Sequence, residues 1–110
     1  MKKLIHQQGD VLLYASEIPA DAKRVDAKAG RYVLAEGEAT GHAHAIADSC
    51  DIELFERAND AGVVTLYLRV REGTLTHEEH GAQVLTPGDY EVGRVVEVDP
   101  FAGEVRRVTD

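Results

Sequence analysis

Short apolar runs broken by turn residues constrain the fold of this chain more than any other feature. The clearest run is residues 63–70, in which polar side chains alternate with Val64, Leu66, Leu68 and Val70. A period of two places successive side chains on opposite faces of a strand, so these four residues are predicted to share one core face. No stretch carries a sustained helical period. The sequence therefore predicts an all-β chain with little or no helix.

Turn residues between the runs predict how the strands are connected. Residues 51–70 are expected to form a hairpin, because Asn59-Asp60-Ala61-Gly62 supplies a turn between two alternating segments. Residues 17–30 are interpreted as a connector with at most one helical turn. Strands spaced by about 8–12 residues favour a small antiparallel barrel or sandwich. Other candidate strands are 11–14, 31–35, 90–98 and 104–108, and the whole chain, 1–110, is expected to form a single domain.

Charge and cysteine usage exclude several partners. The formal net charge of −8 argues against broad contact with nucleic acid or with an anionic membrane, which need clustered Lys and Arg. No segment approaches the ~20 apolar residues needed to span a bilayer, and no signal-peptide apolar region follows the N-terminal lysines. The single cysteine, Cys50, cannot form an intramolecular disulfide. We therefore expect a cytoplasmic protein.

Four of the five histidines form two tight pairs, and these pairs bear most strongly on function. His42 and His44 form an H-x-H, whose two side chains would lie on the same face of a strand. His77 and His80 are three apart, so a turn or bulge would be needed to bring them together. Imidazole is the commonest metal ligand near neutral pH. The four histidines predict one site for a divalent metal, zinc first, with iron, manganese, nickel or copper as alternatives; the competing interpretation is polar residues on an exposed edge and turn.

Two glutamates lie between the second pair of histidines. Glu78 and Glu79 are the nearest carboxylates to the predicted site. One of them is expected to orient an imidazole or to act as general base on a metal-bound water, and solvated turn charges are an equal alternative. The spacing differs from the helical H-E-x-x-H of metalloproteases, so a protease is excluded. His6 and Cys50 are left out of the site.

The order of these motifs resembles the cupin superfamily. Gly41-His42-Ala43-His44 is followed by a hairpin and then by Pro87-Gly88-Asp89, over roughly residues 36–98. The resemblance implies a small β-barrel, jelly-roll-like in form, that holds a divalent metal through an H-x-H, an acidic residue and a later histidine. Here Tyr90 and Glu91 stand where the later histidine of a cupin is expected, and no glutamate follows His44 closely. The chain is also similar to small bacterial and phage proteins with a Gly-Asp-Val-Leu-Leu start and two histidine pairs, which implies no activity.

Two kinds of function follow from this prediction. If three histidines bind the metal and one position stays open, the metal can lower the pKa of a bound water and support a hydrolase or related enzyme acting on a small molecule. If all four bind, the site is closed and structural. The main alternative is a non-catalytic assembly module, a homo-oligomer in which the metal site lies within or between subunits. A metal-independent binder of small ligands is the third alternative.

Overall fold

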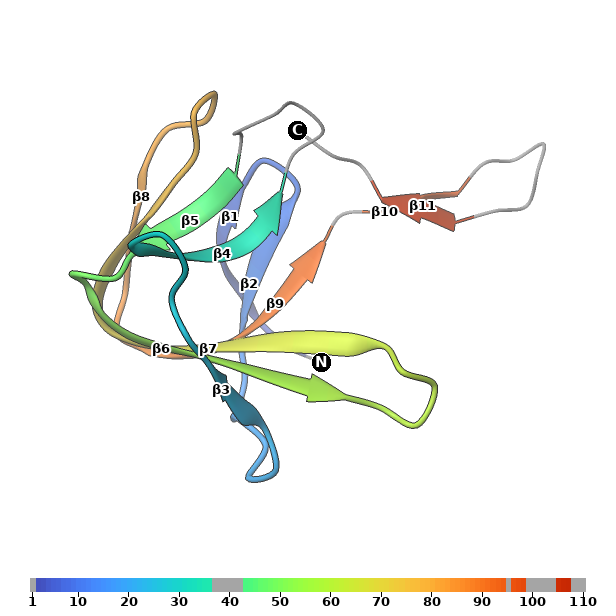
Figure 1. Ribbon diagram of the computed structural model, residues 1–110. Helices are drawn as coiled ribbons and strands as arrows, with labels where there is room; N and C mark the ends of the chain where they lie inside the picture. The colour runs from blue at the N-terminus through green and yellow to red at the C-terminus, as the bar shows by residue number, and fades with distance from the viewer. Residues whose placement is uncertain (1, 37–42, 95, 99–104, 108–110) are drawn as a thin grey trace.

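The computed structural model describes residues 2–36, 43–94, 96–98 and 105–107 (Figure 1). Within these residues nine strands form one antiparallel sheet, two more form a separate pair, and no helix occurs. The predicted all-β antiparallel class is confirmed. Since the described residues contain no helix, they also contain none long and apolar enough to cross a membrane.

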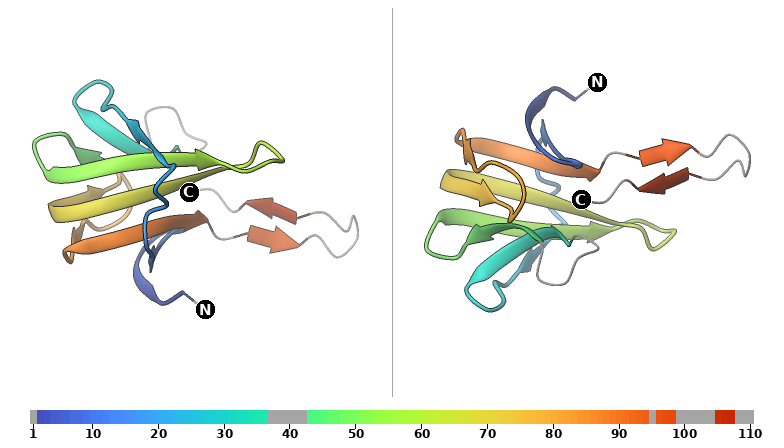
Figure 2. Two further views of the ribbon diagram at one scale, coloured as in Figure 1. Left: turned by 90° about the horizontal axis from the view of Figure 1, so that it is seen from below. Right: turned by 90° about the horizontal axis from the view of Figure 1, so that it is seen from above.

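The strands are short, with one exception. Their bounds, in chain order, are β1 (Leu4–Gln8), β2 (Val11–Ala15), β3 (Lys23–Val25), β4 (Arg31–Glu36), β5 (Ala43–Ala47), β6 (Asp51–Ala58), β7 (Val64–Thr76), β8 (Gln83–Leu85), β9 (Gly88–Arg94), β10 (Val96–Val98) and β11 (Val105–Arg107). The exception is β7, whose 13 residues make it the longest strand. The β10–β11 hairpin lies apart from the other strands (Figures 1 and 2).

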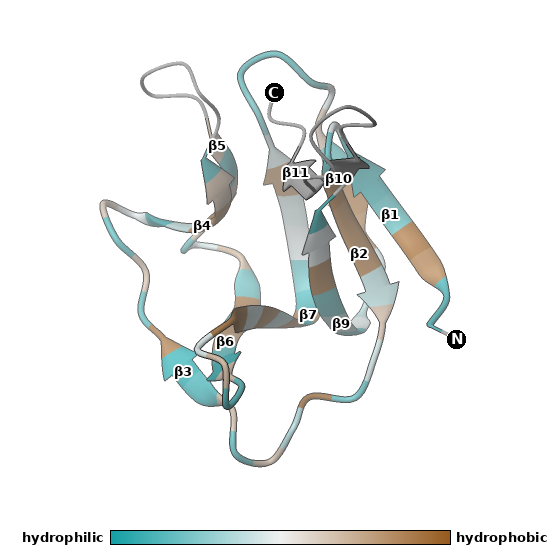
Figure 3. Cartoon of the chain, turned by 90° about the vertical axis from the view of Figure 1, so that its right-hand side faces the viewer, coloured by the Kyte–Doolittle hydropathy of each residue, from teal (hydrophilic) through white to brown (hydrophobic). Residues whose placement is uncertain are grey.

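Strand β7 takes part in two layers of the sheet. Its first part pairs with β6 and β9, and through β9 with β2 and β1. Its last part, Gly73–Thr76, pairs with β8 and β5, and β5 pairs with β4. Figure 3 shows β4 and β5 across from β7, β9, β2 and β1. The sheet thus folds over on itself without closing, which is consistent with a small barrel or sandwich.

Gly73 lies where β7 passes from one layer to the other. A Cβ atom at this position would lie 3.0 Å from Cγ2 of Ile52 and 3.6 Å from Cγ2 of Ile46. The first distance is tighter than ordinary van der Waals contact, and both neighbours are buried β-branched side chains. The absence of a side chain at Gly73 therefore allows the two layers to pack closely at the bend.

The core lies between the two layers and confirms half of the predicted face of β7. Leu68 is 0% and Val70 is 3% exposed, but Val64 is 50% exposed and Leu66 is only half-buried. The prediction for Val64 is wrong because the β6–β7 hairpin extends beyond the facing layer (Figure 1). The other buried core residues are Val11, Leu13, Leu34, Ala35, Ile46, Ile52, Leu54, Leu75, Leu85 and Tyr90.

Two other segments differ from the prediction. The connector 17–30 contains the strand β3, which pairs with β6, and no helical turn. The predicted strand 90–98 begins earlier, at Gly88, and its end belongs to β10, which pairs with β11 instead of joining the main sheet. Residues 99–104, between β10 and β11, lie outside the described residues. Short strands that gain their stability from distant partners carry little local signal.

Ion pairs line the outer side of β7. Arg69 bonds to Asp89 at 3.1 Å, and Arg71 bonds to Asp51 at 3.1 Å and to Glu53 at 3.2 Å. Hydrogen bonding to these carboxylates, followed by their charge, raises the pKa of both guanidinium groups above its ordinary value. These ion pairs therefore favour the charged form of both arginines on this side of β7.

Candidate functional site

Strand β5 places His44 inside the molecule. It lies between β4 and β7, and Ala43, His44, Ala45 and Ile46 are 3%, 1%, 2% and 0% exposed. Because β5 is covered on both faces, its only long polar side chain is buried by the strand's position in the sheet. His42, the other histidine of the H-x-H, lies outside the described residues.

The pairing of β5 with β7 brings the second pair of histidines to His44. Ala45 lies opposite Thr76, so the chain leaves β7 beside His44. The ring centroids of His44 and His77 are 4.3 Å apart, those of His77 and His80 are 4.8 Å apart, and those of His44 and His80 are 5.8 Å apart. Three of the four predicted histidines therefore form one cluster, hereafter the histidine cluster.

The spacing of the rings is close to that of a metal site, but the donor atoms do not yet meet. With metal–nitrogen bonds of about 2.0–2.1 Å and tetrahedral angles, the centroids of two ligating imidazoles lie about 5 Å apart. The three measured separations bracket that distance. Within the described residues, however, no group of three or more His, Cys, Asp or Glu side chains is arranged so that it could hold a metal ion.

Gln8 fixes the orientation of the His44 ring. Its side-chain nitrogen donates to the backbone carbonyls of Leu75 and Gly81, at 3.0 and 2.9 Å. A carbonyl can only accept, so the other end of the Gln8 amide, Oε1, faces His44 Nδ1 at 2.9 Å. Oε1 is an acceptor, and Nδ1 must therefore carry the hydrogen. The lone pair of a neutral His44 is then on Nε2.

Asp10 faces the other nitrogen of His44. Oδ1 of Asp10 lies 3.4 Å from His44 Nε2, and Asp10 is 2% exposed. Its second oxygen, Oδ2, accepts hydrogen bonds from Nε of Arg94 at 2.8 Å and from Nη2 of Arg94. A buried carboxylate is retained only when it is paired, and Arg94 supplies that pairing.

The turn that carries His77 and His80 is organised by its own backbone. The backbone N–H of Glu79 donates to His77 Nδ1 at 3.0 Å. In this arrangement the hydrogen of a neutral His77 is on Nε2. The Nε2 atoms of His77 and His80 are both buried. His77 would need to release the Glu79 N–H before it could bind a metal through either nitrogen, because binding through Nε2 would move the ring hydrogen to Nδ1.

Glu78 connects this turn to β5. Its Oε2 accepts the backbone N–H of Ala43 at 2.9 Å, and its Oε1 lies 4.0 Å from Nη1 of Arg31. These contacts hold the turn beside the strand of His44. Glu79 is exposed in the same turn. The predicted general-base role of Glu78 or Glu79 stays a prediction.

The residues left out of the predicted site lie elsewhere. His6 Nε2 accepts the backbone N–H of Thr86 at 3.1 Å, and Cys50 is half-buried against the core. Gln8, Asp10 and Arg94 were missed by the sequence analysis, because single polar residues carry no spacing signal. The pair Gly9-Asp10, a turn signal, was the one local indication of this part of the site. In the structure Gly9 adopts a φ of 55° at this turn.

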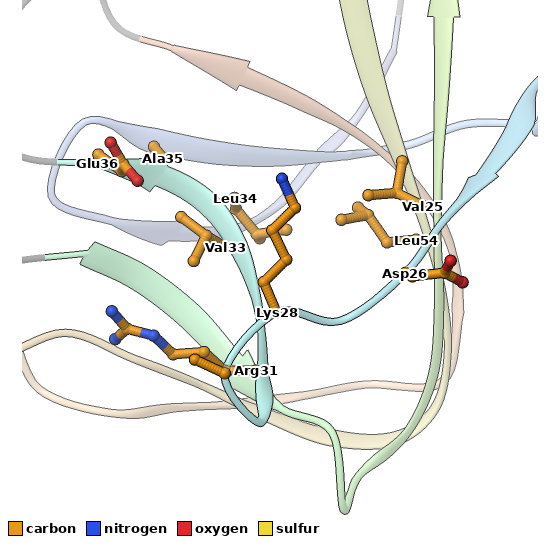
Figure 4. Close-up of a pocket in the computed structure, with 10 residues that line it drawn as sticks. Val25, Asp26, Lys28, Arg31, Val33, Leu34, Ala35, Glu36 and Leu54 are labelled. Carbon is orange, nitrogen blue, oxygen red and sulfur yellow. The ribbon is translucent and has the colours of Figure 1, made fainter.

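A separate cleft of about 500 Å³ lies beside β4 (Figure 4). Its floor is apolar, with Val25, Val33, Leu34 and Leu54, and Lys28 extends across it. Among the described residues, no histidine lines this cleft. It is therefore distinct from the histidine cluster.

Comparison with known proteins gives one match. A family model described as "Domain of unknown function (DUF8820)" matches residues 7–95, which is most of the chain and includes every residue of the cluster described above. No curated protein and no solved structure matches. The resemblance to cupins therefore stays a prediction.

Proposed function

Because the chain belongs to the family described as a domain of unknown function, DUF8820, we propose its function from the candidate site: it binds one divalent metal ion, zinc first, through His42, His44, His77 and His80. The observation that carries the proposal is that the imidazole rings of His44, His77 and His80 lie close together, with ring centroids 4.3–5.8 Å apart. They come from a strand and a turn that are distant in sequence. Placing three imidazole rings side by side, two of them buried, contributes little to apolar packing, since each ring carries polar nitrogens.

The surroundings of His44 support the same proposal. Metal-bound histidines almost always donate their other ring nitrogen to a carbonyl or carboxylate, which fixes the tautomer. For His44 the acceptor is Oε1 of Gln8, and the amide nitrogen of Gln8 donates to two backbone carbonyls that hold it in place. His44 is thus prepared to offer Nε2 as a ligand. Binding by His77 requires a local change in the turn, since Nδ1 accepts the Glu79 N–H.

Hydrolysis at this metal is the second candidate. It needs a ligand position open to water and a path for the substrate. His44 and His77 are buried, but His80 is only partly buried and Glu79 beside it is exposed, so His80 marks the accessible side of the cluster. If the metal keeps a water on this side, Glu79 is the proposed general base.

The test is a metal titration of the metal-free protein. Calorimetry with Zn²⁺ is expected to give about one ion per chain for the wild type. The double variant H44A/H77A is expected to lose this binding, because two ligands are removed. The matched control is H6A, which removes the remaining histidine, one that bonds to Thr86 outside the cluster. It should bind Zn²⁺ as the wild type does.

Two results would contradict the proposal. Unchanged affinity in H44A/H77A would show that the metal binds elsewhere. Absence of binding in the folded wild type would remove the metal site altogether. The number of bound waters, measured by the relaxation of solvent protons with Mn²⁺ or Co²⁺ in place of zinc, then separates an open hydrolytic site from a closed structural one.

A further inference from the structure

We propose that Asp10 is a further ligand of the metal and that its Oδ1 binds the same ion as Nε2 of His44. This inference rests on the proposed function and adds an oxygen donor to it. The turn Gln8-Gly9-Asp10 would then contribute two side chains to the site. Gln8 fixes Nδ1 of His44, and Asp10 binds the same metal as Nε2 of His44.

The β1–β2 turn brings both groups to the same ring. Gln8 ends β1 and Asp10 precedes β2, with Gly9 between them in the left-handed region at φ 55°. Gln8 Oε1 lies 2.9 Å from His44 Nδ1, and Asp10 Oδ1 lies 3.4 Å from His44 Nε2. Two side chains from one turn therefore contact the two nitrogens of an imidazole on a different strand.

With this tautomer of His44, both atoms of the contact, His44 Nε2 and Asp10 Oδ1, can each donate an electron pair to a cation. Since Nδ1 carries the hydrogen that Gln8 accepts, Nε2 of the neutral ring has a lone pair. This lone pair faces a carboxylate oxygen, which also has lone pairs. A divalent cation between Nε2 and Oδ1 would accept a lone pair from each atom, since imidazole nitrogen and carboxylate oxygen are both zinc ligands.

The distance fits a metal better than a proton. Two ligands at about 2.0–2.2 Å from one zinc ion lie about 2.9–3.6 Å apart when the angle between them is 90–120°, as it is with four or five ligands. The observed separation is 3.4 Å. A proton shared by an imidazolium and a carboxylate would instead draw the two atoms to about 2.7–2.9 Å.

Arg94 makes Asp10 a better ligand. Nε and Nη2 of Arg94 both donate to Oδ2 of Asp10, while Oδ1 lies 3.4 Å from Nε2 of His44. Hydrogen bonds to the second oxygen of a ligating carboxylate hold its orientation, as is common around bound metals.

Asp10→Asn tests the proposal because it keeps the shape of the side chain and removes its charge. Zn²⁺ affinity should fall about 10-fold or more. The matched control is D89N, since Asp89 also pairs with an arginine on the same sheet, Arg69, but on the outer side of β7. D89N should bind Zn²⁺ as the wild type does.

The same substitution in an H44A background separates a ligand from a positioning residue. If Asp10 binds the metal itself, D10N weakens affinity further when His44 is absent. If Asp10 acts only by holding His44, D10N has no effect in that background, and the inference is overturned while the proposed metal site stands. If the wild type binds no metal, the proposed function fails first.

A measurement on the wild type covers the case in which D10N does not fold. The ¹³C signal of the Asp10 carboxyl is followed by NMR as Zn²⁺ is added. It is expected to move until one equivalent is bound, while the Asp89 carboxyl stays in place. Histidine signals that move while Asp10 stays unchanged would overturn the inference.

Discussion

The side-chain amide of Gln8 determines the chemistry of the histidine cluster at the scale of single residues. It donates two hydrogen bonds to backbone carbonyls and accepts one from His44. Gln8 itself is only 3% exposed, so these hydrogen bonds form in the interior. A buried network of this kind specifies one arrangement when every member is satisfied. The sequence indicated His44 through its spacing from His42. It did not indicate Gln8 or Asp10, because their contact with His44 depends on the order of strands in the sheet.

Gln8→Leu should destabilise the fold by about 3 kcal/mol or more. The change keeps the approximate size of the side chain but leaves His44 Nδ1 and two carbonyls without this partner, at about 1–3 kcal/mol for each buried group lost. Urea denaturation measures the loss. The control is Gln7→Leu, because Gln7 is exposed and its side chain, among the described residues, bonds to the Gly9 carbonyl two residues away. Its effect should be within about 0.5 kcal/mol; equal effects of the two variants would contradict the role of Gln8.

Metal affinity should also depend on pH at the level of the imidazoles. The ordinary pKa of imidazole is about 6.5, and a protonated ring cannot bind a metal. Protons therefore compete with the metal, and affinity falls as pH drops below this value, with more than one proton taken up for each metal released. Calorimetry between pH 7.5 and 5.5, in buffers of different ionisation enthalpy, measures both quantities. A flat affinity over this range would indicate that carboxylates alone hold the metal.

At the scale of elements, β7 explains both the successes and the errors of the sequence analysis. The 51–70 hairpin was predicted correctly because alternation and the turn at residues 59–62 are local signals. The continuation of β7 into a second layer was not predicted, since it depends on close packing at Gly73 and on pairing with β5 and β8. The alternation likewise gave no sign of where the facing layer ends, so Val64 was wrongly assigned to the core.

Two variants on the same side of β7 measure where the core ends. Leu68→Ala should cost about 2–5 kcal/mol, because Leu68 is 0% exposed and its removal leaves a cavity. Val64→Ala should cost no more than about 0.5 kcal/mol, because Val64 is 50% exposed. Denaturant unfolding under the same conditions gives both values. A large loss for Val64→Ala would show that a further surface, such as another subunit, covers the end of this hairpin.

At the scale of the whole molecule, the site connects distant parts of the chain. The turn after β1 supplies Gln8 and Asp10, β5 supplies His44, the turn after β7 supplies His77 and His80, and β9 supplies Arg94. These elements belong to both layers of the open sheet. Because three rings meet within one chain, the proposed metal site needs no second subunit, which favours the single-chain site over the intersubunit alternative.

Metal binding should therefore stabilise the folded chain without changing its oligomeric state. A ligand that binds only the native state adds about 2.7 kcal/mol at a free concentration of 100 times Kd. At roughly 4 °C for each kcal/mol, the midpoint of thermal unfolding should rise by about 10 °C with Zn²⁺. H44A/H77A should show no such rise, whereas H6A should show it in full. Sedimentation with and without Zn²⁺ completes the test: an unchanged mass agrees with a site inside one chain, and a doubling of mass on adding metal would move the site to a subunit interface and favour assembly as the function.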